Sequence, residues 1–174
     1  YGVLMLYYTL GWKRLKKFSA AGQAPGHTPV TVIIPARNEA GNLPALLEAL
    51  RRQTYHPSLL EVIIIDDFST DNTAGIVRNF PADNIHLLEL RQHLNEEQRL
   101  NSYKKKAIEI AISRAAGALI VTTDADCVMG PRWIETMVQF YEQHQPKFIA
   151  APVSFYMEHN FFKRCQSLDF MTMQ

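Results

Sequence analysis

Cysteine and net charge are both scarce in this sequence of 174 residues, and each scarcity excludes a class of protein. The two cysteines, Cys127 and Cys165, lie far apart and fit no metal-ligand spacing, so we expect two free thiols in a reducing compartment. The formal net charge is only +1, and no basic stripe carries interleaved aromatic residues, so nucleic-acid binding is not expected. The residues that are abundant, 47% hydrophobic and 20% charged, are typical of one globular domain with a core.

The beginning of the sequence is apolar and aromatic over residues 1–12, and the basic segment KRLKK follows at residues 13–17. This run is too short to cross a bilayer, and a signal peptide would place its positive charge first rather than last. An apolar and aromatic segment followed by basic residues is typical of the cytoplasmic end of a membrane helix. The alternative is a helix docked on the domain or on a membrane surface. We therefore expect a membrane-associated or partial transmembrane helix over residues 1–18 and a linker over residues 19–28.

Apolar strand patterns alternate with helix patterns over the rest of the chain. Buried strands are predicted over residues 29–35, 60–66, 84–90, 118–124 and 147–153. Helices are predicted to begin at Asn42, at Ser69 to Asp71, at Lys104 and at Pro131, with Gly117 ending the third helix and a loop over residues 91–103. Because the strands are continuous apolar runs, this alternation indicates an α/β fold, a mostly parallel sheet flanked by helices.

Acidic residues follow three of the predicted strands. The strand ends read PARNE at residues 35–39, DDFST at residues 66–70 and TTDADC at residues 122–127. Ligands of such sheets bind outside the carboxyl ends of the strands, and carboxylates gathered there repel one another unless a cation or a donor-rich ligand is present. The alternative is that each Asp caps the following helix or turn, which is our interpretation of Asp71. The residues expected at this edge are Glu39, Asp66, Asp67, Asp124 and Asp126.

The Asp-x-Asp pair of Asp124 and Asp126 suits a metal site. A turn directly after the strand would bring both carboxylates into one site with different tasks, and hard oxygen ligands select Mg²⁺ or Mn²⁺, which bridges phosphates. Lysines occupy residues 104–106, at the start of a predicted helix, where the helix dipole disfavours cations. These lysines form either a solvated charged face or a phosphate contact.

The order of four segments resembles the nucleotide-sugar-binding half of a family 2 glycosyltransferase with the Rossmann-like GT-A fold. The segments are IIPARNEAGNLPALLEAL, VIIIDDFSTDNT, KKKAIEIAI and ALIVTTDADCVMGPRW, and the resemblance covers about residues 29–170. It implies that one of Asp66 and Asp67 binds a uracil-type base, and that Lys104 lies near the nucleotide although Tyr103 replaces the usual Gly. The implied nucleotide-sugar site is Pro35, Ala36, Asn38, Glu39, Asp66, Asp67, Lys104 and Asp124, and the implied Mg²⁺ or Mn²⁺ site is Asp126 with Asp124.

The resemblance also implies an activity, partners and a location. The activity is metal-dependent transfer of a sugar, with inversion, from a nucleoside-diphosphate sugar such as a UDP-sugar to a glycan or lipid-linked acceptor. The apolar and basic N-terminus resembles the membrane-linked bacterial members, which implies a catalytic domain on the cytoplasmic side of the inner membrane. The catalytic base of the family is expected beyond Gln174, so residues 29–174 would be a truncated donor-binding domain that is inactive alone.

Two alternatives from other classes stay open. A nucleotidyltransferase also uses carboxylate-held metal on an α/β sheet, but that class would place a Gly-rich phosphate loop after the first strand, and residues 35–42 contain one Gly. The second alternative is a non-catalytic nucleotide-binding domain tethered to a membrane. The sequence does not identify the sugar, the acceptor, or which of Asp66 and Asp67 contacts the base.

Overall fold

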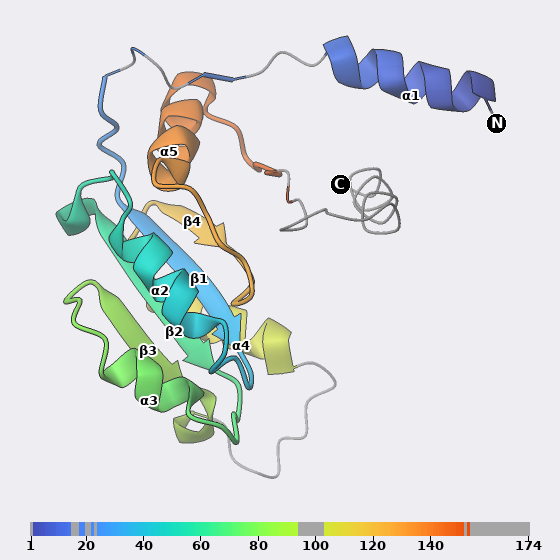
Figure 1. Cartoon of the computed structure of the whole chain (residues 1–174). Helices are drawn as coiled ribbons and strands as arrows, with labels where there is room; N and C mark the ends of the chain where they lie inside the picture. The colour runs from blue at the N-terminus through green and yellow to red at the C-terminus, as the bar shows by residue number, and fades with distance from the viewer. Residues whose placement is uncertain are drawn as a thin grey trace. The chain divides into compact units, whose positions relative to one another are not determined.

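The computed structural model describes residues 2–14, 18–19, 22, 24–93, 103–151 and 153 (Figure 1). The chain divides into two units, residues 1–143 and residues 144–174, and the sheet lies in the first. The elements in chain order are α1 (Gly2–Arg14), β1 (Val30–Ala36), α2 (Leu43–Arg51), the 3₁₀ turn η1 (Pro57–Leu59), β2 (Leu60–Asp66), α3 (Thr73–Arg78), β3 (Ile85–Glu89), the 3₁₀ turn η2 (Leu90–Gln92), α4 (Tyr103–Ile112), β4 (Leu119–Thr122) and α5 (Trp133–His144).

The four strands form one parallel sheet in the order β3-β2-β1-β4. Ala36 pairs with Asp66, which pairs with Glu89, so β1, β2 and β3 end level with one another. The strand order reverses beside β1, since β2 lies on one side of it and β4 on the other. A parallel sheet with flanking helices confirms the predicted fold class, and the reversal places the expected ligand crevice between the carboxyl ends of β1 and β4.

Each face of the sheet carries its own apolar core, because successive strand side chains point to opposite faces. On β1, Val32 and Ile34 pack in the cluster formed with α2, α3 and α5. Ile33 faces the other way, into the cluster that contains Ala107 and Ala111 of α4. Figure 1 shows α2 and α3 on one face of the sheet and α4 behind it. Burial on both faces explains why the strands are continuous apolar runs in the sequence.

The predicted fifth strand is wrong for the residues that the structure describes. Residues 147–151 and 153 contain no strand, and the side chain of Phe148 is 84% exposed. An apolar run becomes a strand only where a neighbouring strand supplies hydrogen bonds for its backbone. No described segment pairs with these residues, so the apolar pattern alone was not sufficient.

The predicted end of the third helix is also wrong. The helix α4 stops at Ile112, which is 49% exposed, so Gly117 does not end it. Gly117 instead passes close to β1: its amide donates to Thr31 Oγ1 at 2.8 Å, and an added Cβ would lie 2.3 Å from the Thr31 nitrogen. The helix starts at Asn42 and near Asp71 are close to the prediction, although the residue before α3 is Asn72 and neither Asn42 nor Asn72 makes a side-chain cap.

The residues before β1 include the helix α1 and a segment that is hydrogen-bonded to α5. The exposed large apolar side chains of α1 are Val3, Leu4, Leu6, Tyr7, Tyr8 and Leu10. Within the described residues, no helix combines the length and apolarity that crossing a bilayer needs. Part of the expected linker is fastened to α5, since Glu142 Oε1 accepts hydrogen bonds from the amides of His27 and Thr28 at 2.8 and 2.9 Å. Cys127 is a free thiol, whereas Cys165 and residues 94–102 lie outside the described part of the chain.

Candidate functional site

A pocket opens beside β1 at the carboxyl edge of the sheet. Residues that end or follow β1, β2 and β4 line it, so three separate parts of the chain contribute side chains. The pocket lies where the strand order reverses, which is the position predicted for a ligand site in this class of sheet. Its lining residues are Pro35, Ala36, Arg37, Glu39, Asp67, Asp124, Ala125 and Asp126.

Most of the residues predicted from the sequence meet in this pocket, and two of the described ones do not line it. Asn38 and Asp66 are absent from its lining. The side chain of Lys104 lies outside the described part of the structure, so its contact with the nucleotide stays a prediction. Arg37 lines the pocket and was missed. The available signal was its position, a lone cation between the apolar strand and Glu39.

Asp66 and Asp67 occupy different environments although they are adjacent. Asp66 is 1% exposed, and neither of its carboxylate oxygens has a hydrogen-bond partner among the described groups. The nearby cation is Arg91, whose Nη2 lies 3.8 Å from Asp66 Oδ2. Asp67 is 7% exposed and lines the pocket. Of the two carboxylates, Asp67 is therefore the one that lines the pocket.

The buried position of Asp67 makes its carboxylate less acidic. Burial raises the pKa of Asp67, Arg37 lowers that pKa through its charge, and the neighbouring Asp66 raises it. Its Oδ1 is buried and has no partner among the described groups. A buried acceptor without a partner costs free energy, so a ligand that donates a hydrogen bond to Asp67 would be stabilised here.

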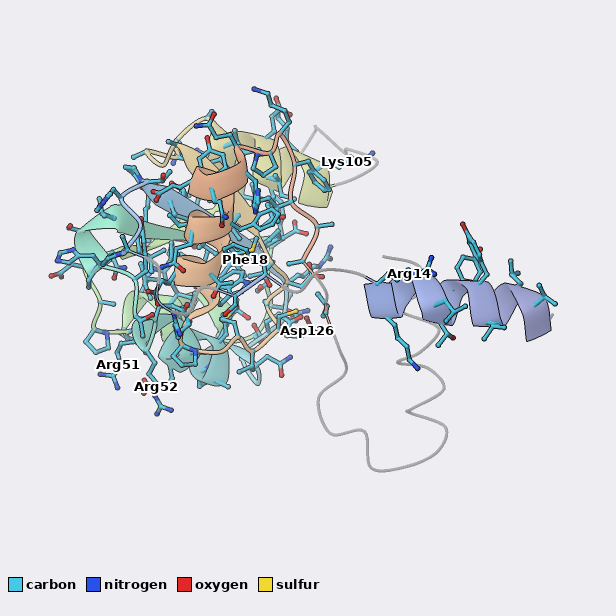
Figure 2. All side chains as sticks on the ribbon, turned by 90° about the horizontal axis from the view of Figure 1, so that it is seen from above. Arg14, Phe18, Arg51, Arg52, Lys105 and Asp126 are labelled. Atoms are coloured by element: carbon cyan, nitrogen blue, oxygen red, sulfur yellow. The ribbon has the colours of Figure 1, made fainter. Side chains whose placement is uncertain are left out.

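Asp124 and Asp126 flank a turn that follows β4. Thr123 donates its amide to the Ile33 carbonyl at 3.3 Å, and Cys127 donates to the Asp124 carbonyl at 3.3 Å, which closes the turn. Ala125, between the two carboxylates, is only 3% exposed, so it anchors the turn in the core. Both Asp side chains are exposed, and Figure 2 shows Asp126 at the surface of the domain. The expected turn is present, and both carboxylates line one pocket.

The acidic residues of the pocket suit a cation that also binds phosphate. The described residues contain no group of three or more His, Cys, Asp or Glu side chains that would enclose a metal without further ligands. Mg²⁺ and similar hard cations are commonly held by one or two carboxylates together with substrate phosphates and water. Asp124 and Asp126 supply oxygen ligands of this kind at the pocket mouth, so the residues present fit a shared protein–substrate cation.

Hydrogen bonds join the turn after β1 to the turn after β2, and we call this set the turn-to-turn network. Three consecutive amides of the first turn donate to side chains of the second turn and of Thr73, the first residue of α3. In return, the amide and hydroxyl of Thr70 donate to Asn38 Oδ1 at 2.8 and 3.2 Å. The three amide bonds are Asn38 N to Ser69 Oγ at 3.0 Å, Glu39 N to Thr73 Oγ1 at 2.9 Å and Ala40 N to Asp71 Oδ2 at 3.0 Å.

Comparison with known proteins places this architecture in a family. Residues 31–172 match the family described as Glycosyl transferase family 2. Glycosyltransferase AglE of Haloferax volcanii is 35% identical over 108 residues, which is 61% of this chain and 33% of that protein. The mannosyltransferase PcManGT from Pyrobaculum calidifontis, solved in complex with GDP-Man and Mn²⁺, is 32% identical and superposes with a TM-score of 0.62 over 80% of this chain and 40% of its own.

A second solved structure shares the fold. Residues 1–349 of S. aureus TarS superpose with a TM-score of 0.58 at 23% identity, over 74% of this chain and 40% of the TarS chain. The sequence thus spans well under half the length of these similar proteins. The likenesses confirm the predicted GT-A-like fold. Because the family match covers residues 31–172 of 174, the chain belongs to glycosyltransferase family 2.

Proposed function

We propose that the pocket binds a nucleoside-diphosphate sugar and that the protein transfers the sugar to a glycan or lipid-linked acceptor. The observation that carries this proposal is the pocket at the strand-order reversal, where Glu39, Asp67, Asp124 and Asp126 meet with Arg37. Two similar structures support it, because PcManGT was solved with GDP-Man and Mn²⁺ and TarS with UDP-GlcNAc.

In this proposal Asp67 recognises the base. Its unpartnered, buried Oδ1 accepts a hydrogen bond from a ring N–H of the base, which satisfies an acceptor that otherwise has no partner among the described groups. Pro35 and Ala36 form part of the pocket wall without offering a competing charge. Uracil offers one such N–H, and we propose a UDP-sugar as the donor. A guanine base also offers N–H donors, so a GDP-sugar is the competing result of the experiment below.

Asp126 and Asp124 would hold Mg²⁺ or Mn²⁺ together with the diphosphate of the donor. Such a cation, when bound, neutralises the negative charge that develops on the leaving diphosphate. Arg37 adds a fixed guanidinium at the same pocket, where it favours a phosphate oxygen over water. The transfer itself is proposed as a single displacement with inversion, in which a general base removes the proton of the acceptor hydroxyl.

The turn-to-turn network weighs against the nucleotidyltransferase alternative. That class would cradle phosphate with free amides after the first strand. Here the amides of Asn38, Glu39 and Ala40 already donate to side chains of the second turn and of α3. A non-catalytic nucleotide-binding domain would share the pocket but not the reaction. Donor binding without sugar transfer would support that alternative.

We also propose that residues 1–18 attach the domain to the cytoplasmic face of a bacterial inner membrane. The exposed apolar side chains of α1, followed by the exposed Lys13 and Arg14, support contact with an anionic lipid surface. Co-sedimentation with anionic vesicles tests this contact. The full chain should sediment and a chain starting at residue 19 should not, and equal sedimentation of the two would contradict the proposal.

Thermal unfolding with UDP, GDP and their sugars, each with and without Mn²⁺, tests donor binding. A ligand at a hundred times its Kd should raise the midpoint by about 5–10 °C, since it binds only the folded state. Asp126→Ala should abolish the part of this shift that depends on Mn²⁺, and Asp67→Ala should reduce the shift with and without the metal. Asp83→Ala is the matched control, because Asp83 is exposed and precedes β3 at the other end of the sheet. No shift with any nucleotide and Mn²⁺ would overturn the proposal.

A further inference from the structure

We propose that Asn38 is a positioning residue, which fixes the two strand-end turns to each other so that Arg37, Glu39 and Asp67 line one pocket. This inference rests on the proposed function and changes the role that the sequence suggested for Asn38. It assigns the residue no contact with the donor. Its neighbours on both sides, Arg37 and Glu39, line the pocket, whereas Asn38 does not.

Asn38 uses its backbone and its side chain to bind the second turn. Its φ of 57° lies in the left-handed region, which Asn adopts more readily than most residues. In that conformation its amide donates to Ser69 Oγ at 3.0 Å, and its Oδ1 accepts from both the amide and the hydroxyl of Thr70. One residue thus makes three hydrogen bonds to residues about thirty positions later in the chain.

The rest of the network continues this connection into α3. The Thr73 hydroxyl donates to Asp71 Oδ1 and accepts from the amide of Glu39, so its direction is set by both partners. Asp71 also accepts from the amides of Thr73 and Ala40, both at 3.0 Å. These bonds, with the Thr73 hydroxyl as the main cause, hold the pKa of Asp71 below its usual value. Asp71 is therefore a charged acceptor at neutral pH, and such acceptors make stronger hydrogen bonds than neutral ones.

The network determines which groups remain for the donor. A third connection, from the Asp67 amide to the Ala36 carbonyl at 2.9 Å, joins the two turns where they leave the sheet. The turns are thus tied at their base and along their length, and Asp67 is held next to the residues of the first turn. The amides of residues 38–40 are occupied and therefore are not available to the donor diphosphate.

Two substitutions at Asn38 separate positioning from direct contact. Asn38→Gly keeps the left-handed backbone, since Gly adopts positive φ without strain, but it removes the Oδ1 acceptor. Asn38→Asp keeps an Oδ acceptor and replaces only the amide NH₂. A contact with the donor through that NH₂ would be lost in both variants, whereas the positioning role survives in Asn38→Asp.

Asn84→Ala is the matched control. Asn84 Nδ2 donates to the Leu60 carbonyl at 2.9 Å, which also ties together two separate parts of the chain. This bond lies at the start of β2, at the opposite end of the strand from Asp66. Loss of this bond in Asn84→Ala shows how the fold responds when a hydrogen bond between distant parts of the chain is missing, without a change at the pocket.

The experiment measures the affinity of the full chain for UDP and for GDP with Mn²⁺ by calorimetry, in about 0.3 M salt to screen the charge added in Asn38→Asp. Asn38→Gly should bind about tenfold more weakly, because two hydrogen bonds of typical net strength are removed. Asn38→Asp should bind within about threefold of wild type, and Asn84→Ala should bind as wild type does. Hydrogen exchange at the amides of residues 39, 40 and 70 should accelerate in Asn38→Gly alone.

Three results would overturn the positioning role: wild-type affinity in Asn38→Gly, equal losses in Asn38→Gly and Asn38→Asp, or equal losses in Asn38→Gly and Asn84→Ala. Unchanged exchange in Asn38→Gly would overturn the network itself. A wild-type chain that binds neither nucleotide contradicts the proposed function, and with it the role of Asn38. The three results above instead require a wild-type chain that binds, so the two failures are distinguishable.

Discussion

Arg91 places its guanidinium against the buried carboxylate of Asp66. Its Nη2 lies 3.8 Å from Asp66 Oδ2 and donates to the Ser69 carbonyl at 2.9 Å. The end of β3 is thereby joined to the same turn that Asn38 binds from β1. The second turn is consequently held from both neighbouring strands of the sheet, and its buried charge has a cation on one side.

Arg91→Ala should destabilise the fold, because it leaves the Asp66 carboxylate buried without its cation. Breaking an entirely buried ion pair would cost more stability, but the Arg91 side chain is 51% exposed. We therefore expect the free energy of unfolding in urea to fall by about 1–2 kcal/mol. Arg132→Ala is the control, since Arg132 is 50% exposed and pairs with Glu135, which is also partly exposed. That variant should lose less than about 1 kcal/mol. Equal losses in the two variants would show that burial of Asp66 adds nothing.

Asp67→Asn should separate stability from nucleotide binding. The pKa of Asp67 is raised by burial, so the fold disfavours its charged form, and the stability that this group contributes at low pH is lost as pH rises through its folded pKa. Removal of the charge should therefore raise stability at pH 7 while it weakens binding of UDP or GDP. Urea unfolding and calorimetry test the two effects. The prediction fails if Asp67→Asn lowers stability at pH 7 relative to Asp83→Asn.

Glu142→Gln should flatten the dependence of stability on acid pH. Burial raises the pKa of Glu142, but the amides of His27 and Thr28 and the Thr28 hydroxyl lower it further, so the net shift is downward. A depressed carboxyl pKa contributes stability above the unfolded pKa, and this contribution is lost as pH falls through the folded value. Urea unfolding between about pH 6 and pH 3 tests the prediction. Glu109→Gln, at an exposed position of α4, is the control for removal of a carboxylate. A wild-type slope in Glu142→Gln would contradict the prediction.

Gly117→Ala should destabilise the protein although it is a small change. The added Cβ would lie 2.3 Å from the Thr31 nitrogen and 2.6 Å from the Val30 carbonyl carbon, and neither backbone atom can move without shifting β1. We expect a loss of about 1–3 kcal/mol in thermal or urea unfolding. Gly41→Ala is the matched control, because open space surrounds Gly41. A loss at Gly41 equal to that at Gly117 would contradict the steric explanation.

The sequence predicts the parallel sheet well because burial on both faces leaves a direct signal. The predicted strand over residues 60–66 coincides with β2, whose seven residues are almost all buried. The same signal failed at residues 147–151, where an apolar run has no neighbouring strand among the described residues. Strand pairing depends on distant parts of the chain, so a local pattern cannot supply it.

The candidate site is predictable to the extent that it depends on where strands end. Asp67 and Asp126 were expected at the carboxyl edge from strand positions alone, and both line the pocket. The difference between Asp66 and Asp67, the part played by Arg37 and the bonds of Asn38 were not predictable. They depend on the path of two turns, including a φ of 57° at Asn38 and 53° at Phe68. No spacing in the sequence encodes those angles.

The turn-to-turn network also divides the PARNE segment into parts that can and cannot change independently. Arg37 makes none of the bonds of that network and lines the pocket. Exchange of this one side chain would therefore alter the charge offered to a ligand and leave both turns in place. Asn38, by contrast, cannot lose its Oδ1 acceptor without releasing the second turn. A protein built in this way can acquire a new ligand preference at position 37 while position 38 preserves the shape of the pocket.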